Sequence, residues 1–448
     1  MESFINTVIC GRCEVVLKDF PDNSVDALVT DPPYGLKFMN KKWDCDVPGV
    51  EIWKEIFRVL KPGAHILCFA GTRTYHRMVC NIEDSGFIIR DMIQWLYGSG
   101  FPKNMDVSKA IDKQAGAKRE TIRTVRAGFG KRNGIKDKDG GIFQNSLPEN
   151  LKQVDVTAPA TDQAKQWDGW GTALKPANEP ICLAMKPISE KTIADNVLKW
   201  GTGGINIDES RVGDYGARFN GRKVDSDIYG KYGTAKPKED YNKGRWPANI
   251  ILDEEAGEML DEQSGQSKSS SGFRGLQNSG RHGGVADLGD NIKEGTNSIM
   301  GHSDSGGASR FFYCPKASQE ERNIGLEDLP ERTTDDGRKK TNDTAYQRGK
   351  TLRRNNHPTV KPLELMRYLV RMITPPGGIV LDSFFGSGTT GMAAVKEGFD
   401  YIGIEESDKD CEMSRLRIAA MKREKENIIV EAEKTGDKKS YKQLSLEV

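Results

Sequence analysis

The chain has 448 residues, with 66 Lys and Arg against 65 Asp and Glu, so its formal net charge is +1. Hydrophobic residues make up 36% and charged residues 29%, which indicates an ordinary core and roughly two to four domains, or one large domain with an insertion. The near-zero charge excludes a histone-like basic coat but permits a local basic groove. No apolar run approaches the ~18 residues of a membrane span, and the N-terminus lacks the pattern of a secretory signal.

The stretch 1–100 predicts alternating strands and helices. Short apolar strands are expected at 25–30 and 64–70, and helical periodicity runs through 50–60 until Lys61-Pro62-Gly63. Strand–helix–strand order with short turns favours a parallel α/β sheet.

The stretch 101–312 has a different composition. A basic run covers 103–138, and a segment rich in Ser and Gly covers 263–310. The Ser- and Gly-rich segment buries little apolar surface. Because apolar pieces at 179–185 and 246–252 lie between these two segments, we expect the insertion to have some core of its own.

The α/β pattern returns within 313–420. A helix is expected over 362–373, and buried strands at 378–382 and 401–405. The last stretch, 421–448, is charged and helix-prone, which predicts a peripheral helix that frays into a tail.

A glycine-rich turn follows the strand at 378–382 and opens a helix. Gly386, Gly388 and Gly391 match the pattern G-x-G-x-x-G, and Glu405 ends the next strand about 20 residues on. Glycines let the backbone approach a ligand, and the acid accepts ribose hydroxyls. The turn predicts a nucleotide-cofactor site; nicotinamide enzymes and S-adenosylmethionine enzymes both use such turns, and a tight turn without a ligand also stays open.

A rigid polar loop, Asp31-Pro32-Pro33-Tyr34, follows the strand at 25–30. Ligands bind at this carboxyl edge in open α/β sheets, and the two prolines hold the loop in place. A carboxylate and a fixed carbonyl can hold an exocyclic amine while the ring stacks on a flat base. The alternative without a functional role is a proline turn that merely ends a strand.

A third motif, His357-Pro358-Thr359-Val360-Lys361-Pro362, leads into the helix before the glycine turn. Thr359 and Lys361 could reach a carboxylate near the helix N-terminus. Ordinary helix-entry chemistry with an early proline is the alternative.

Taken together, these three motifs resemble the DNA amino-methyltransferases of the β order, in which the catalytic motif precedes the cofactor motif. The stretches 70–77 and 244–249 are similar to a subgroup common in phages and prophages. One departure is Arg12, which stands where the family often has an Asp facing the cofactor adenine.

The resemblance implies an α/β, doubly wound, Rossmann-like fold for an S-adenosylmethionine-dependent methyltransferase, assembled from 1–100 and 313–420 and interrupted by an inserted target-recognition region. The implied catalytic residues are Asp31, Pro32, Pro33 and Tyr34. The implied residues for S-adenosylmethionine are Cys13, Asp31, Thr359, Lys361, Asp382, Phe384, Phe385, Gly386, Ser387, Gly388, Thr389 and Glu405.

The implied reaction is methyl transfer to adenine N6 of a base flipped out of double-stranded DNA. A tetrapeptide beginning with Asp is typical of the adenine enzymes in this family, and cytosine N4 is the alternative. An RNA or protein methyltransferase, a nicotinamide-dependent oxidoreductase and a catalytically silent DNA-binding module are more distant alternatives. The resemblance further suggests a cytoplasmic protein, bacterial or phage-encoded, and leaves open a homodimer and a cognate restriction endonuclease.

Within the basic run, four residues are predicted to contact DNA phosphates. These residues are Lys118, Arg119, Arg123 and Arg126. A solvated helical face is the alternative.

The eight scattered cysteines make no disulfide framework, so we expect a reduced protein. Cys10 and Cys13 form a C-x-x-C pair, but no second Cys or His pair lies at zinc spacing. We therefore expect no metal.

Overall fold

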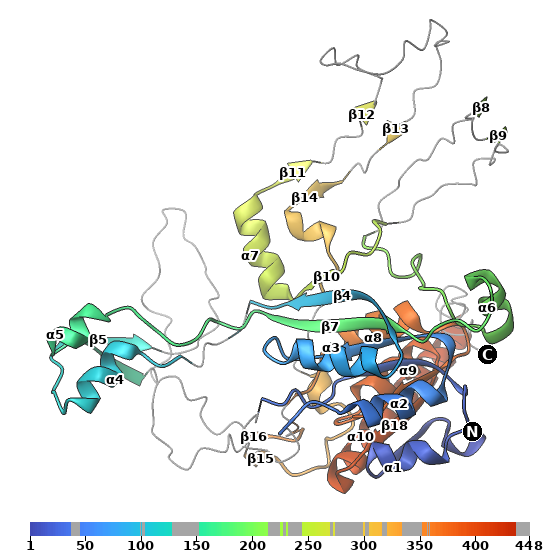
Figure 1. Ribbon diagram of the computed structural model, residues 1–448, viewed down its shortest axis with the longest axis horizontal. Coiled ribbons are helices and arrows are strands. Elements are labelled where there is room, and N and C mark those ends of the chain that lie inside the picture. Colours follow the sequence, from blue (N-terminus) through green and yellow to red (C-terminus); the bar gives the residue numbers. More distant parts are fainter. Residues whose placement is uncertain are drawn as a thin grey trace, which may run out of the picture.

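The computed structural model describes residues 1–36, 45–98, 100, 104–127, 152–213, 225–226, 230–231, 244–268, 272–273, 299–300, 304–315, 320–333, 352–355, 357 and 359–435. Eight of the described strands form one sheet (Figure 1). In spatial order they are β1 (Thr7–Cys10), β18 (Asp400–Glu405), β17 (Ile379–Asp382), β2 (Val25–Thr30), β3 (Leu60–Phe69), β7 (Asn178–Met185), β4 (Ile88–Leu96) and β10 (Ile250–Leu252).

Neighbouring strands of this sheet are parallel except at β7. Strands β1, β18, β17, β2 and β3 follow one another in parallel register. β7 runs antiparallel to both β3 and β4, and β10 is parallel to β4. The N-terminal end of β7 therefore lies at the same sheet edge as the carboxyl ends of β3 and β4.

Helices cover both faces of the sheet. Alternate residues of β3 belong to two different cores: Leu67 and Phe69 pack with one helical layer, and Ile66 and Cys68 with the other. The first layer comprises α8 (Leu363–Ile373), α9 (Thr389–Glu397) and α10 (Asp408–Thr435). The second comprises α1 (Cys13–Val16), α2 (Val50–Val59) and α3 (Tyr75–Asp84).

A strand buried on both faces shows a continuous apolar run. This explains why the strands expected at 25–30, 378–382 and 401–405 coincide with β2, β17 and β18. The three-layer, mostly parallel arrangement confirms the predicted doubly wound α/β fold.

The apolar pieces expected to form a core of the insertion lie in the main sheet instead. β7 inserts between β3 and β4, and β10 extends the sheet beyond β4. Apolar runs show that a strand is buried, but they carry no information about which sheet it joins. Strands from the middle of the chain thus complete the sheet begun by its N-terminal stretch.

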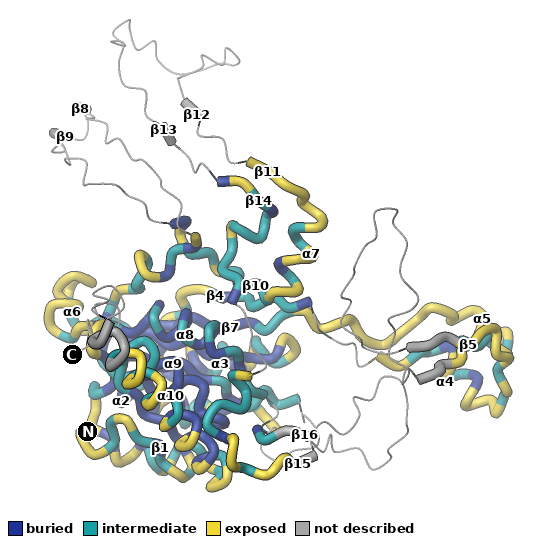
Figure 2. The backbone as a smooth tube through the Cα atoms, turned by 180° about the vertical axis from the view of Figure 1, so that it is seen from behind, coloured by how far each residue is buried: buried dark blue, intermediate teal, exposed yellow. Residues whose placement is uncertain are grey.

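Two other parts of the stretch 101–312 leave the sheet as separate units. One, which we term the α4–α5 unit, comprises α4 (Val107–Gln114), β5 (Thr121–Ala127), β6 (Lys152–Thr157) and α5 (Asp162–Gln166). It projects sideways from the sheet in Figure 1. Those of its residues whose burial is described are mostly exposed or half-buried in Figure 2, where the buried residues concentrate around the sheet. A second unit comprises α7 (Glu254–Ser264), η6 (Ala308–Phe311), β11 (Ser267–Lys268) and β14 (Ser305–Gly306).

Short elements complete the described chain. They are η1 (Glu2–Phe4), η2 (Leu17–Asp19), α6 (Ile193–Trp200), β8 (Asp225–Ser226), β9 (Gly230–Lys231), β12 (Gly272–Phe273), β13 (Ile299–Met300), η7 (Glu321–Asn323), β15 (Arg332–Thr333) and β16 (Leu352–Arg353). Helix α10 continues past the expected start of the tail at 421, as far as Thr435. None of the described helices is long and apolar enough to cross a membrane.

Cys10 at the end of β1 and Cys411 in α10 form a disulfide. This differs from the expected reduced state. The two cysteines are 401 residues apart in the chain, so no local sequence pattern pairs them.

Candidate active site

Two parallel strands bring the catalytic loop and the glycine turn to one edge of the sheet. β2 and β17 are neighbours, with Ala27 opposite Val380 and Leu28 opposite Leu381. The loop that begins at Asp31 and the turn that begins at Ser383 therefore leave the sheet side by side. This is the edge where open α/β sheets bind ligands.

Asp382 ties these two strand ends together. Its carboxylate accepts hydrogen bonds from the Thr30 hydroxyl at 2.7 Å, the Thr390 hydroxyl at 2.5 Å and the Phe384 backbone N–H at 3.0 Å. Burial nevertheless raises the pKa of Asp382 to about 6. Asp382 therefore connects the end of β2 to the glycine turn and to α9 through hydrogen bonds.

The glycine turn is anchored to the end of β18 through Glu405. The Gly386 N–H donates to one carboxylate oxygen at 2.7 Å, and the Ser407 N–H to the other at 2.9 Å. Burial raises the pKa of Glu405. Gly386 has φ +51°, and an added Cβ would lie 3.0 Å from the His357 ring. The turn thus needs glycine at this position for both conformation and space.

Gly388 has a packing role in the turn, and its predicted contact with the cofactor stays a prediction. It does not line the cavity. A Cβ there would lie 2.6 Å from the Ser414 Cβ on α10, and its φ is +79°. The packing of α10 on the turn and the left-handed start of α9 therefore both require a glycine at this position.

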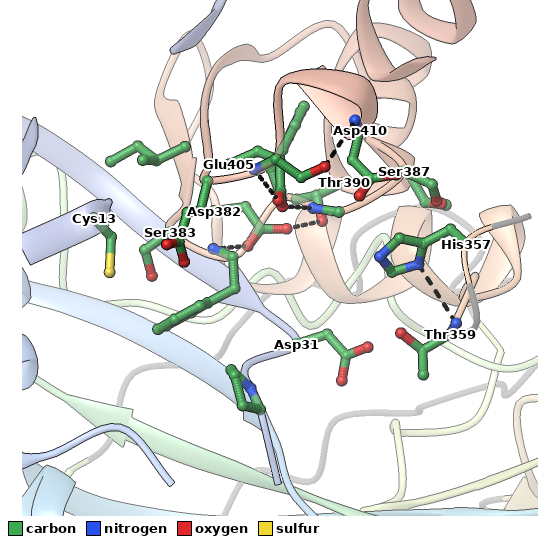
Figure 3. A pocket seen from close by; sticks show the side chains of 18 of the residues that line it. Cys13, Asp31, His357, Thr359, Asp382, Ser383, Ser387, Thr390, Glu405 and Asp410 are labelled. Carbon is green, nitrogen blue, oxygen red and sulfur yellow. Dashed lines mark hydrogen bonds between the residues drawn. The ribbon is translucent and has the colours of Figure 1, made fainter. Parts of the chain in front are cut away.

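One cavity of about 620 Å³ unites the predicted residues (Figure 3). A volume of this size suits a nucleotide-sized ligand. The predicted residues on its wall are Cys13, Asp31, Pro33, Thr359, Lys361, Asp382, Phe384, Phe385, Gly386, Ser387, Thr389 and Glu405. Besides Gly388, the predicted residues that are not on this wall are Pro32 and Tyr34.

Phe385 contributes to the wall mainly beneath the surface. Its side chain is 4% exposed and belongs to the core, with its ring stacked at 6.3 Å and 6° on Tyr401. Phe384 is less buried and packs against the other core. The two neighbouring phenylalanines therefore point to different layers.

Two further residues on the wall were not among the predicted cofactor residues. The Ser383 hydroxyl is buried and has no hydrogen-bond partner among the described residues, so it is available to a polar ligand. Burial lowers the pKa of His357 to about 4, which leaves a neutral imidazole beside the glycine turn. These groups, with Glu405, fit the ribose and amino-acid parts of S-adenosylmethionine.

A cluster of four charged or polar side chains includes two residues of the cavity wall, Asp31 and Lys361. The Lys361 ammonium is 2.9 Å from the Asp31 carboxylate, 2.8 Å from the Glu179 carboxylate and 3.1 Å from the Tyr34 hydroxyl. The Tyr34 hydroxyl donates to the other Asp31 oxygen at 2.6 Å. We call these four residues the Asp31 cluster.

Burial sets the direction of the pKa shifts in the Asp31 cluster. It raises the pKa of Asp31, and the Lys361 ammonium offsets this only in part. Burial alone would lower the pKa of Lys361, but the Asp31 and Glu179 carboxylates raise it above its ordinary value. Burial and the two carboxylates also raise the pKa of Tyr34, so its hydroxyl stays protonated and donates.

The sequence placed Lys361 at the cofactor carboxylate, whereas in the structure its ammonium is paired with Asp31 and Glu179. Glu179 was missed altogether. The available signal was an acid beside a proline at the start of an apolar run, Asn178-Glu179-Pro180. That pattern gives no partner, because β7 joins the sheet from the middle of the chain.

The residues predicted to contact DNA lie in the α4–α5 unit and do not behave alike. Lys118 and Arg123 are exposed. Arg119 instead donates to the Asp112 carboxylate at 2.7 Å and the Thr157 hydroxyl at 3.0 Å, with a side chain only 12% exposed. Arg119 therefore stabilises this unit from within, which corrects its prediction as a phosphate contact. The side chain of Arg126 and the rest of the run to 138 lie outside the described residues.

Comparison with known proteins places the chain in a family. The family model described as DNA methylase matches residues 25–416. The chain is 39% identical over 92 residues to the DNA adenine methyltransferase YhdJ of Escherichia coli strain K12, covering 20% of this chain and 31% of that protein. It is 29% identical over 160 residues to the type II methyltransferase M.HindIII of Haemophilus influenzae, covering 35% and 38%.

The chain thus spans about a third of the length of these curated relatives. Among solved structures, the M1.HpyAVI–SAM complex aligns with a TM-score of 0.37 at 14% identity, over 92% of this chain and 98% of that one. The cytosine-N4-specific PvuII DNA methyltransferase aligns with a TM-score of 0.39 at 14% identity, over 92% and 85%. Because the family model runs from β2 into α10 and includes both the catalytic loop and the glycine turn, the chain belongs to the DNA methylase family.

Proposed function

We propose that this protein transfers a methyl group from S-adenosylmethionine to the N6 amine of an adenine flipped out of double-stranded DNA. One observation carries this proposal: the Asp31 carboxylate and the glycine turn share the wall of one cavity. A carboxylate that can accept an amine hydrogen lies in the same cavity as a turn that can bind the cofactor. This arrangement suits the transfer of a methyl group between two bound molecules.

S-adenosylmethionine supplies an electrophilic methyl group when it is bound. Glu405 would accept hydrogen bonds from the ribose, and the backbone from Gly386 to Ser387 would approach the amino-acid part. The Ser383 hydroxyl and the Cys13 backbone offer further polar contacts. The remaining contacts come from Asp31, Thr359, Asp382, Phe384, Phe385 and Thr389. Lys361 lines the cavity, but its ammonium stays with Asp31 and Glu179.

The catalytic loop prepares the amine. The Asp31 carboxylate and the Pro32 carbonyl accept its two hydrogens, which draws the nitrogen lone pair out of conjugation with the ring. The two prolines keep these acceptors fixed, so little reorganisation is needed at the moment of reaction. The nitrogen–carbon bond forms as the carbon–sulfur bond of the sulfonium breaks, which leaves a neutral thioether. The methylated amine then gives up one hydrogen as a proton, which the Asp31 carboxylate takes and passes to solvent. No covalent bond between enzyme and base is required.

Tyr34 supports the flipped base by stacking its ring on it. Flipping costs a few kcal/mol, which stacking and hydrogen bonds in the pocket offset. In the structure the Tyr34 hydroxyl is bonded to Asp31. The incoming amine therefore has to share Asp31 with this hydroxyl or displace it.

The choice of adenine depends on the tetrapeptide beginning with Asp and on the similarity to a protein named as a DNA adenine methyltransferase. Cytosine N4 is also an exocyclic amine, so the same acceptors serve it. The partner of the protein is duplex DNA in the cytoplasm of a bacterium or of a phage-infected cell. A homodimer and a cognate restriction endonuclease stay predictions.

Methylation with isotope-labelled S-adenosylmethionine tests the proposal on duplex DNA, RNA and protein substrates in parallel. Digested DNA is then resolved by mass spectrometry, and we expect labelled N6-methyladenine. Labelled N4-methylcytosine alone would refute the base and keep the mechanism. Label in RNA or protein only, or a change in nicotinamide absorbance without methylation, would refute the function.

A further inference from the structure

We propose that Glu179 is a positioning residue for methyl transfer, which holds the Lys361 ammonium so that the Asp31 carboxylate keeps its capacity to accept the target amine. This inference rests on the proposed methyl transfer to an amine. It assigns a role to a strand that the catalytic and cofactor motifs do not include.

The reversed strand β7 carries Glu179 to the active site. Because β7 is antiparallel to β3, its start lies at the carboxyl end of β3, where Ile181 pairs with Phe69. The Ala70 N–H donates to the Pro180 carbonyl at 2.9 Å, which fixes the backbone next to Glu179. The carboxylate is thus held by the sheet and not by a loop.

Glu179 shares the donors of the Asp31 cluster. An ammonium has three N–H donors, and Lys361 has three acceptors within 3.1 Å, one each on Asp31, Glu179 and Tyr34. The Lys361 side chain is 9% exposed, so water cannot readily replace a missing acceptor. Without Glu179, the buried ammonium would be balanced by Asp31 alone.

The balance of charge in the cluster follows from this sharing. Two carboxylates and one ammonium leave the cluster with a net charge of −1, which favours an approaching amine N–H. If Glu179 were neutral, the net charge would be zero and the ammonium would be committed to Asp31. Asp31 would then be a weaker acceptor for the amine.

A structural ion pair would also explain the contact between Glu179 and Lys361, and pH dependence separates the two roles. Asp31 is faced by Lys361 from the entry to α8, Glu179 from β7, Tyr34 from its own loop, and Cys68 and Asp382 from β3 and β17. Asp31 is in direct contact with Tyr34 and Lys361. It interacts electrostatically with Glu179, Cys68 and Asp382.

Within this set the negative charge of Glu179 raises the pKa of Asp31. Removing that charge lowers the pKa of Asp31. Since Asp31 must be ionised to accept the amine, the acid limb of kcat/KM would move to lower pH even as kcat falls. A purely structural loss would reduce the rate and leave the acid limb in place.

The experiment compares wild type with Glu179→Gln, which keeps the shape of the side chain and removes its charge. Glu190→Gln is the matched control, because Glu190 forms an ion pair with Lys199 outside the active site. We expect kcat of Glu179→Gln to fall about 10- to 100-fold, with a cofactor Kd close to that of wild type. The acid limb should move to lower pH.

Glu179→Asp retains the charge and should recover part of kcat with the acid limb of wild type, whereas Glu190→Gln should match wild type throughout. The inference is overturned if Glu179→Gln keeps the kcat and acid limb of wild type, or loses activity with the acid limb unmoved. If Glu179→Gln does not fold, Glu179→Ser carries the same comparison. Absence of amine methylation by wild type would instead refute the proposed function itself.

Discussion

Asp31 combines two properties that oppose each other. In the proposed reaction it must be ionised to accept an amine hydrogen, but burial raises its pKa. The Lys361 ammonium 2.9 Å away favours the ionised form and partly compensates. Activity should therefore fall as the pH drops through a pKa that lies above that of an ordinary aspartate.

We predict that Asp31→Asn lowers turnover by about 10²- to 10³-fold, because the amine loses its charged acceptor. Binding of S-adenosylmethionine should be largely retained, since the glycine turn is untouched. Methyl incorporation and calorimetry measure the two effects. Asp84→Asn, at an exposed position of α3, is the control and should behave as wild type. A variant that loses cofactor affinity and turnover together would contradict the role given to Asp31.

Glu405 provides the corresponding test of the cofactor site. Glu405→Ala removes both acceptors of the turn, and we expect S-adenosylmethionine affinity to fall by about 10- to 100-fold, as for the loss of a charged hydrogen-bond partner. Glu412→Ala, at an exposed position of α10 outside the cavity, should leave affinity unchanged. Equal calorimetric Kd values for the two variants would remove Glu405 from the site.

At the scale of the element, the turn between β17 and α9 packs against α10 and also lines the cavity. Three adjacent positions of the turn differ in what they contact. Gly386 and Ser387 line the cavity, whereas Gly388 lies against α10. A glycine pattern alone cannot separate these roles, because both require the absence of a side chain.

We expect Gly388→Ala to lower the free energy of unfolding by about 1–3 kcal/mol, through the close approach to Ser414 and the left-handed backbone. The double variant Gly388→Ala/Ser414→Gly should recover the part caused by the close approach and keep the backbone part. Chemical denaturation measures both. If Gly388→Ala were as stable as wild type but bound S-adenosylmethionine poorly, the glycine would serve the ligand after all.

The elements that sequence patterns predicted well are those whose evidence is local. β2, β17, β18, α2 and α8 each carry their own apolar run or helical period. The catalytic and glycine loops were found because each follows such a strand directly. Three other features depend on contacts between distant segments. They are the position of β7 in the sheet, the ion pair of Arg119 with Asp112 and the ion pair of Lys361 with Glu179. Residue type and spacing carry no information about those contacts.

At the scale of the whole molecule, the sheet and the α4–α5 unit carry different groups of candidate functional residues. The sheet holds the cavity, whereas the exposed Lys118 and Arg123 lie on the projecting unit. We propose that this unit contacts the phosphates of the bound duplex. Affinity would then depend on salt through the release of counterions.

Replacing both Lys118 and Arg123 by Ala should make the slope of log affinity against log salt shallower by about 2, since each phosphate that the protein neutralises adds about 0.9 to the slope. The double variant Lys18→Ala/Lys54→Ala, at exposed positions near α1 and in α2, is the control and should retain the slope. Fluorescence anisotropy with one duplex over a salt series measures it. An unchanged slope in the Lys118 and Arg123 variant would return these residues to a merely solvated face.

The order of strands in the sheet also bears on how the protein is made. β2 emerges from the ribosome early, yet its neighbour β17 lies more than 350 residues later, with Ala27 opposite Val380. Until then one edge of β2 has no strand to pair with, and such edges invite association with other chains. Nascent chains should therefore rely on chaperones, and the cofactor cavity should close only when synthesis has passed Glu405.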